Sequence, residues 1–171
     1  MSIASLPKPQ ATGRYRIALV CLGNICRSPM ADVVLAARVH EAGLVDAVEV
    51  VSAGTGDWHV GRPMDERAAD LLTAQGYDAT RHRAQQVPAS WLDDFDLVLA
   101  MDAANLSDLR SIAPTTPEDR LRLFRDFDPS ETGGEVPDPY YGGVDGFHDV
   151  LTMVERTAEV IVGDLSRVVS H

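Results

Sequence analysis

Short, mostly apolar runs alternate along the chain with segments whose apolar residues recur at helical spacing. The runs have the length and composition of buried parallel strands and lie at residues 15–20, 48–52, 95–101 and 121–124. The helical spacing is found between Ser28 and Gly43, and at residues 65–74, 103–112 and 147–165. This alternation predicts an α/β fold, with a four-stranded parallel sheet covered by helices on both faces.

Two segments follow neither pattern. Residues 1–13 contain two prolines and a glycine and no apolar run, which predicts a flexible tail before a single domain at residues 14–171. Residues 126–146 are rich in proline and glycine and are predicted to form a long loop full of turns. Ser28 followed by Pro29 is a helix start signal, with Ser28 as the expected cap.

Composition excludes several classes of protein. The formal net charge of -11 argues against a nucleic-acid partner, since nucleic acids are bound by basic surfaces. No stretch approaches the about 20 apolar residues that a membrane span needs. The N-terminus lacks the apolar core of a signal peptide. We therefore expect a cytoplasmic protein with no membrane partner, while export by a route that needs no signal peptide stays open.

The chain has two cysteines, Cys21 and Cys26. A secreted disulfide scaffold would need more of them, spread more widely. A zinc site would need a CxxC pair or clustered histidines beside them, so no metal is expected. Two thiols within one short loop point to chemistry.

The loop from Cys21 to Arg27 has the sequence of an anion cradle, because a predicted strand leads into it and a predicted helix leaves it. Successive backbone N–H groups can then point inward, with the helix dipole behind them. Gly23 and Asn24 tolerate the left-handed backbone that a tight cradle requires. A thiol in this positive field favours its thiolate form, and Arg27 can hold two phosphoryl oxygens. Ser28 could donate a hydrogen bond to the Cys21 sulfur.

The segment Val20-Cys21-Leu22-Gly23-Asn24-Ile25-Cys26-Arg27-Ser28-Pro29-Met30-Ala31 closely resembles the signature of the low-molecular-weight protein tyrosine phosphatases. Residues 51–55 resemble the second-strand segment of that family, and residues 138–142 resemble its acid loop. Residues 58–61 resemble the corresponding segment of its bacterial, actinobacterial-like members. The general C-x5-R pattern is only moderately specific, but this extended form is very specific.

The resemblance implies a phosphotyrosine phosphatase that works through a phosphocysteine intermediate. Cys21 is implied as nucleophile, Arg27 as phosphate binder and Asp138 as general acid and base. Implied substrate- or phosphate-binding residues are Leu22, Gly23, Asn24, Ile25, Cys26, Ser28, Trp58, His59, Tyr140 and Tyr141. Asn24, Ser52 and His82 correspond to family positions that hold the loop in shape by hydrogen bonds. Ile25 favours phosphotyrosine, since relatives that act on phosphoarginine have threonine there.

The same resemblance implies no metal and no cofactor, because Arg27 and backbone amides meet the phosphoryl charge. Expected partners are phosphotyrosine-containing proteins, with inorganic phosphate as product, and the protein is expected to be a monomer. Tyr140 or Tyr141 could also be phosphorylated by a tyrosine kinase, a possibility that the sequence leaves open. Cys26 is either a packing residue or the partner of Cys21 in a protective disulfide.

Three other functions compete with this interpretation. Arsenate reductases share the fold and the C-x5-R loop, but they relay electrons through further cysteines, and none exists outside residues 21–26. Asp126 and Asp128 form a D-x-D after a strand, as in magnesium-dependent phosphatases, although a simple turn is the favoured reading. A module that only binds phosphotyrosine would need neither Cys21 nor Asp138.

Overall fold

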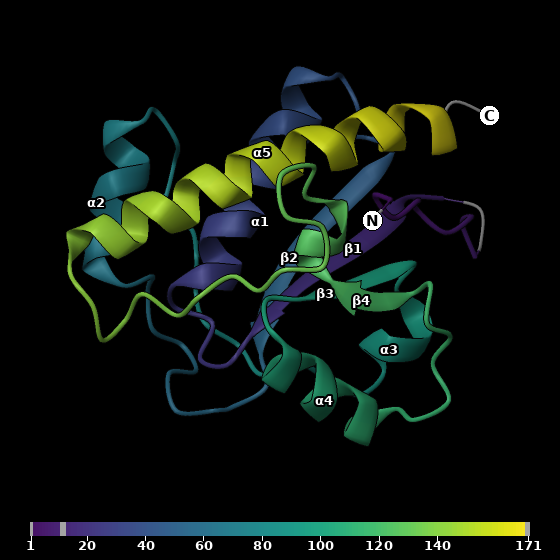
Figure 1. The fold of residues 1–171 in the computed structure, drawn as a ribbon, viewed down its shortest axis with the longest axis horizontal. Coiled ribbons are helices and arrows are strands. Elements are labelled where there is room, and N and C mark those ends of the chain that lie inside the picture. The colour runs from purple at the N-terminus through teal and green to yellow at the C-terminus, as the bar shows by residue number, and fades with distance from the viewer. Residues whose placement is uncertain (1, 11–12, 170–171) are drawn as a thin grey trace.

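A parallel sheet lies at the centre of the molecule (Figure 1). The computed structural model describes residues 2–10 and 13–169. Within these ranges the sheet has the strands β1 (Tyr15–Cys21), β2 (Val48–Gly54), β3 (Leu97–Ala100) and β4 (Leu121–Leu123). They lie in the order β2-β1-β3-β4, and each neighbouring pair is parallel. The predicted four-stranded parallel sheet is confirmed.

Helices cover both faces of the sheet, as the alternating pattern predicted (Figure 1). One face carries α1 (Arg27–Glu41), α2 (Glu66–Ala74) and α5 (Val144–Val168). The other carries α3 (Trp91–Asp94) and α4 (Ala103–Ile112). A short 3₁₀ helix, η1 (Phe124–Phe127), follows β4.

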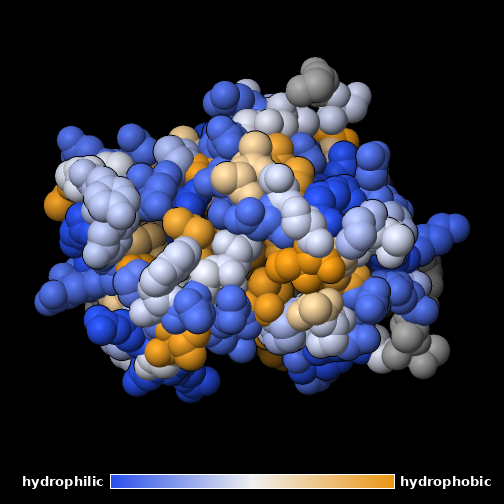
Figure 2. Space-filling model, turned by 90° about the horizontal axis from the view of Figure 1, so that it is seen from below, coloured by the Kyte–Doolittle hydropathy of each residue, from blue (hydrophilic) through white to orange (hydrophobic). Residues whose placement is uncertain are grey.

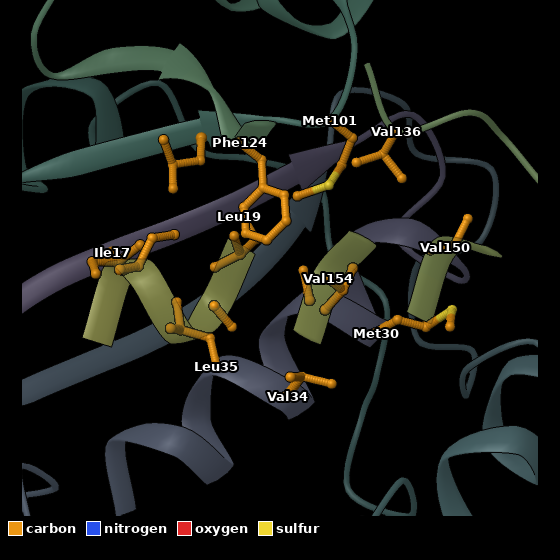
Figure 3. Packing of buried hydrophobic residues seen from close by; sticks show 14 of the residues in the cluster. Ile17, Leu19, Met30, Val34, Leu35, Met101, Phe124, Val136, Val150 and Val154 are labelled. Atoms are coloured by element: carbon orange, nitrogen blue, oxygen red, sulfur yellow. The ribbon is translucent and has the colours of Figure 1, made fainter. Parts of the chain in front are cut away.

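The central strand β1 feeds two separate cores, because successive side chains of a strand point to opposite faces. Ile17 and Leu19 pack into the core under α1 and α5, whereas Ala18 and Val20 face the core under α3 and α4. Figure 3 shows the first of these cores, in which α1 contributes Met30, Val34 and Leu35, and α5 contributes Val150 and Val154. The end of β1 is thereby fixed from both sides, and the loop after it starts from a rigid base.

Element boundaries differ from the predictions where tertiary contacts override local signals. Helix α1 begins at Arg27 with Cys26 at the N-cap position, so Ser28 is not the cap and lies in the first turn. Its hydroxyl contacts the Cys21 sulfur and Asn24 instead. The four-residue helix α3 was not predicted, because it is too short to show a period.

The segment at residues 2–10 lies against the domain and is not the loose tail that its composition predicted. The Leu6 side chain is buried, and its backbone N–H donates to the Asp164 carboxylate at 2.9 Å. The Tyr15 hydroxyl donates to the Pro7 carbonyl at 2.8 Å. An extended segment makes few backbone hydrogen bonds within itself, and here side chains of the domain bind one of its N–H groups and one of its carbonyls. Residues 1, 11 and 12 of the predicted tail lie outside the described residues.

The surface seen in Figure 2 is mainly hydrophilic, with hydrophobic side chains gathered in patches near its middle. Charged residues make up 24% of the chain, an ordinary share for a globular protein. In the part of the chain that the structure describes, no helix combines the length and apolar character needed to cross a bilayer.

The two aspartates of the D-x-D segment are engaged by arginines and backbone amides. Asp126 accepts hydrogen bonds from the Leu123 N–H and from Arg122, at 3.2 and 3.3 Å. Asp128 is fully buried and is held at 2.8 Å by both Arg125 and Arg156. Across residues 2–10 and 13–169 no group of three or more histidine, cysteine or acidic side chains is arranged to hold a metal ion. The segment forms the end of η1 and its C-cap Asp128, and its two carboxylates are bound by arginines and backbone amides.

We expect Asp128→Ala to lower the free energy of unfolding by roughly 3 kcal/mol, because it leaves two arginines without their buried partner. Burial alone would raise the pKa of Asp128, but hydrogen bonds from Arg156, Ser130 and Arg125 hold it well below its usual range. This stabilisation is therefore present above the unfolded-state pKa of about 3.9 and is lost as pH falls below it.

Urea denaturation at pH 7 and pH 3 measures both effects, with Asp119→Ala, an exposed carboxylate, as control. The assignment of Asp128 fails if the two variants lose the same stability at pH 7, or if the Asp128 loss does not shrink at pH 3.

Candidate active site

The loop between β1 and α1 crosses the carboxyl end of β2 at very close range. The Thr55 N–H donates to the Cys21 carbonyl and the Gly56 N–H to the Leu22 carbonyl, both at 2.9 Å. A Cβ atom on Gly54 would lie 2.6 Å from the Leu22 carbonyl oxygen, which no side chain could tolerate. A glycine at the end of β2 therefore allows the loop to lie directly on the strand.

Asn24 holds the loop in shape from within. It is fully buried and has a left-handed backbone, with φ of 58°. Its side-chain amide donates to the hydroxyls of Ser28 and Ser52, at 2.8 and 3.0 Å, and its side-chain oxygen accepts from the Gln85 N–H at 3.0 Å. Its carbonyl lies 2.7 Å from His82 Nε2. Four contacts to one residue leave the loop little freedom to change its backbone.

The Cys21 sulfur lies at the base of this loop with two polar partners. The Ser28 hydroxyl is 3.0 Å from Sγ, and the Asn24 N–H donates to Sγ at 3.3 Å. Cys26 belongs to the same apolar cluster as Cys21, and burial raises the pKa of its thiol, with Asp65 adding to the effect. Both cysteines are free in the structure. Of the two sulfurs, that of Cys21 has the surroundings of a nucleophile.

Arg27 is buried beside the sulfur and is held by groups from distant parts of the chain. Its Nη1 donates to Asp102 at 2.5 Å and to the Val136 carbonyl at 3.1 Å. Burial opposes its charge, but Cys21 and Asp102 raise the pKa of Arg27 above its ordinary value. The guanidinium is therefore a fixed positive charge at the loop.

Asp138 reaches the loop from a segment more than a hundred residues away. The Val136 N–H donates to the Met101 carbonyl at 2.8 Å and so ties this segment to the end of β3. Asp138 Oδ2 then lies 3.7 Å from Arg27 Nη2, while Oδ1 accepts a hydrogen bond from the Tyr140 N–H at 3.0 Å. The carboxylate is about one-third exposed. It can exchange a proton with solvent and with a molecule in the cleft.

A cleft of about 410 Å³ opens above the loop. Its lining consists of Cys21, Leu22, Gly23, Ile25, Cys26, Arg27, Trp58, His59, Asp138, Tyr140 and Tyr141. Trp58 and Tyr141 are the most exposed of the aromatic side chains in this lining. Cys21, Arg27 and Asp138 therefore line one cleft, together with aromatic side chains. The cleft can hold an oxyanion with an aromatic ring attached to it.

Four predicted site residues do not line the cleft. Asn24 and Ser28 were predicted to bind substrate or phosphate, but both side chains are fully buried behind the loop, where they bind each other. Ser52 is buried in the same layer, His82 is half-buried beside it, and both contact Asn24. These side chains can act on a bound anion only through the loop that they hold.

Other residues of the site were not found from the sequence. Asp102, the partner of Arg27, caps α4 by accepting a hydrogen bond from the Asn105 N–H. Its position directly after the third predicted strand was the available signal, because ligands of such sheets lie at the carboxyl ends of strands. Asp32 lies behind the loop near Ser52, and burial raises the pKa of Asp32 to about 7. Neither Asp32 nor Gln85 belongs to a motif.

Comparison with known proteins places these features in a family. The family model for low molecular weight phosphotyrosine protein phosphatase matches residues 16–170. A low molecular weight protein-tyrosine-phosphatase of Streptomyces coelicolor is 51% identical over 84% of this chain and 89% of its own length. Low molecular weight protein-tyrosine phosphatase A of Mycobacterium tuberculosis is 47% identical over 81% of this chain and 84% of its own length. The solved structure of YfkJ from Bacillus subtilis is 34% identical in sequence and superimposes with a TM-score of 0.84. The match covers 92% of this chain and 98% of the YfkJ chain.

Proposed function

Because the chain belongs to the low molecular weight phosphotyrosine protein phosphatase family, we propose that its cleft hydrolyses phosphotyrosine with Cys21 as nucleophile, Arg27 as phosphate binder and Asp138 as general acid. The protein is a protein tyrosine phosphatase, and the family's mechanism is cysteine-based. The observation that carries the residue roles is their meeting at one cleft, with the Cys21 sulfur at its base between two hydrogen-bond partners.

In the first step the Cys21 thiolate attacks phosphorus, and the bond from phosphorus to the tyrosine oxygen breaks. Asp138 gives its proton to that oxygen, so tyrosine leaves as a neutral phenol. Arg27 and the inward N–H groups of the loop stabilise the charge on the three equatorial oxygens. The product of this step is phosphocysteine at residue 21.

In the second step a water molecule attacks the phosphocysteine from the side that tyrosine has left. The Asp138 carboxylate accepts a proton from this water while the sulfur–phosphorus bond breaks. Inorganic phosphate is released and Cys21 leaves as a thiolate. The Ser28 hydroxyl, 3.0 Å from Sγ, stabilises the negative charge that returns to sulfur. The cycle needs no metal ion and no cofactor.

The walls of the cleft favour an aryl phosphate. Leu22 and Ile25 offer apolar surface next to the loop, and Trp58, Tyr140 and Tyr141 offer flat faces on which a phenyl ring can pack. Phosphoserine places its phosphate on a much shorter side chain and would fill little of this apolar space. The physiological substrates are then proteins that carry phosphotyrosine.

We expect a phosphotyrosine peptide to be hydrolysed much faster than the same peptide carrying phosphoserine or phosphoarginine. The assay measures phosphate release with each peptide, in buffer alone and with EDTA. Activity should survive EDTA, because the proposed steps use protein groups only. The proposal for the substrate fails if phosphoserine or phosphoarginine is the better substrate, and a magnesium-dependent mechanism gains support if EDTA abolishes turnover.

The alternative functions predict different results. Arsenate reduction is not favoured, because no cysteine lies outside residues 21–26 to relay electrons. It would show as arsenate-dependent consumption of an external thiol. A module that only binds phosphotyrosine would retain the peptide and release no phosphate.

The proposal also includes the location, oligomeric state and source of the enzyme. We infer a cytoplasmic, monomeric enzyme from a bacterium, by analogy with the Streptomyces, Mycobacterium and Bacillus relatives. Tyr141 is 91% exposed and Tyr140 39%, so a tyrosine kinase could reach the first and, with some movement, the second.

A further inference from the structure

Beyond Asp138 the chain is buried at Pro139 and then exposed at residues 140–143. We call residues 137–143 the acid loop. Val136 anchors its start, through the Met101 and Arg27 contacts described above. Its own turn is closed by the hydrogen bond from the Gly142 N–H to the Pro139 carbonyl. That internal bond shapes the loop but does not determine how far it lies from Cys21.

Arg67, in the first turn of α2, reaches across to this loop. Its Nη2 donates to the Tyr140 carbonyl at 2.9 Å, and its Nη1 donates to the Gly142 carbonyl at 3.3 Å. Its guanidinium carbon also lies 4.7 Å from the centre of the buried Phe147 ring and 5.5 Å from that of Tyr140. One side chain thus holds two carbonyls of the acid loop and a ring at the start of α5.

The other side of the same guanidinium is tied to the phosphate-binding loop. Asp65, the N-cap of α2, binds Arg67 Nε through Oδ1 at 3.2 Å and Nη2 through Oδ2 at 3.1 Å. Hydrogen bonds from Arg67 hold the pKa of Asp65 below its usual value, although burial opposes this. The Asp65 N–H donates to the Ile25 carbonyl at 2.8 Å. The contacts therefore run without a break from Ile25 through Asp65 and Arg67 to Tyr140.

We propose that Arg67 is a positioning residue that holds the acid loop over the phosphate-binding loop, so that Asp138 can reach the leaving oxygen. The proposal rests on the proposed role of Asp138 as general acid. Arginine suits the task because its planar fork can bind a carboxylate on one edge and two carbonyls on another. Lysine has the charge but not the fork, and would hold the loop at one point only.

We expect Arg67→Ala to reduce kcat up to about 100-fold on phenyl phosphate, because a shift of about 1 Å in a reacting group can have that effect. The leaving group of this substrate is as basic as tyrosine, with a pKa of about 10, and it needs the acid's proton. On 2,4-dinitrophenyl phosphate, whose leaving group needs no proton, the loss should be small. Arg67→Lys should recover part of the phenyl phosphate activity.

The matched control is Arg81→Ala, which removes the same charge from a side chain that is 92% exposed. It should leave both substrates unchanged. Asp65→Asn serves as a second test variant, since asparagine also caps helices but does not pair with the guanidinium as an anion. It should show a smaller loss than Arg67→Ala with the same dependence on the leaving group. Thermal unfolding of each variant shows whether it is folded.

A double-variant cycle decides between positioning and a general structural role. If Arg67 acts through the acid, Arg67→Ala combined with Asp138→Ala should be no slower on phenyl phosphate than Asp138→Ala alone. The inference is overturned if the two losses multiply, or if Arg67→Ala and Asp65→Asn slow both substrates equally. Failure of the proposed function would look different, because Asp138→Ala itself would then show no dependence on the leaving group.

Discussion

Cys21→Ser is expected to give a folded protein with no measurable hydrolysis of an aryl phosphate. The serine hydroxyl stays protonated at neutral pH and is a far weaker nucleophile than a thiolate. The side chain is nearly isosteric, and the loop around it is held by Asn24 independently of the sulfur. The fold should survive while turnover disappears.

The matched control for this prediction is Cys26→Ser, which alters the other thiol of the same loop. Cys26 packs in the core and its raised pKa keeps it protonated, so this variant should retain measurable turnover even if packing suffers. Trapping of phosphocysteine by rapid acid quench should succeed with wild type and fail with Cys21→Ser. Substantial turnover by Cys21→Ser would rule out the proposed nucleophile.

The Cys21→Ser protein should also keep its affinity for phosphotyrosine, because Arg27 and the loop amides are untouched. A pull-down with this variant, eluted with inorganic phosphate, would then identify the phosphoproteins that the cleft accepts. Capture that Arg27→Ala abolishes would show that the phosphate site itself is responsible.

Asp138→Ala is expected to slow phenyl phosphate hydrolysis by roughly 10²–10⁴-fold, the usual contribution of a general acid. Without a proton donor the phenolate must leave as an anion from a site built to hold negative charge on phosphorus. The loss should shrink on 2,4-dinitrophenyl phosphate, since that anion is a good leaving group by itself. Steady-state kcat on the two substrates measures the difference.

Asp138→Asn separates the chemistry of this residue from its structural role. An asparagine side-chain oxygen can still accept the hydrogen bond from the Tyr140 N–H, which in the structure is 3.0 Å from Asp138 Oδ1. It has no acidic proton to give, so it should be as slow as alanine on phenyl phosphate. Near-normal activity of Asp138→Asn, or equal losses across leaving groups, would mean that Asp138 is structural.

Much of the fold could be read from the pattern of apolar residues, because strands and helices differ in period. The helix at residues 103–112 has the predicted bounds, and the parallel sheet follows from the alternation of elements. The prediction was wrong at Ser28, where local propensity indicated a cap. Asn24 and Cys21 bind the Ser28 hydroxyl in the fold, and these contacts override the local preference.

The segment at residues 2–10 shows where prediction from the sequence fails. Its composition is that of a loose tail, and nothing within it predicts order. Its order comes from partners elsewhere in the chain. The Tyr15 hydroxyl donates a hydrogen bond to the Pro7 carbonyl, and the Asp164 carboxylate accepts one from the Leu6 N–H. A segment without its own period can be ordered only by such contacts, which short-range patterns cannot reveal.

The chemistry of the loop from Cys21 to Arg27 follows from its sequence alone. Strand, cradle and helix follow one another directly, so the thiol, the amides and the guanidinium come together through local backbone geometry. The groups that surround this loop come from distant parts of the chain, and tertiary contacts place them. Asp102 and Val136 aim Arg27, Gly54 makes room for the backbone, and Arg67 connects the loop to the segment that carries Asp138. These contacts join residues tens of positions apart over about 3 Å, and only the packing of the whole domain brings such atoms together.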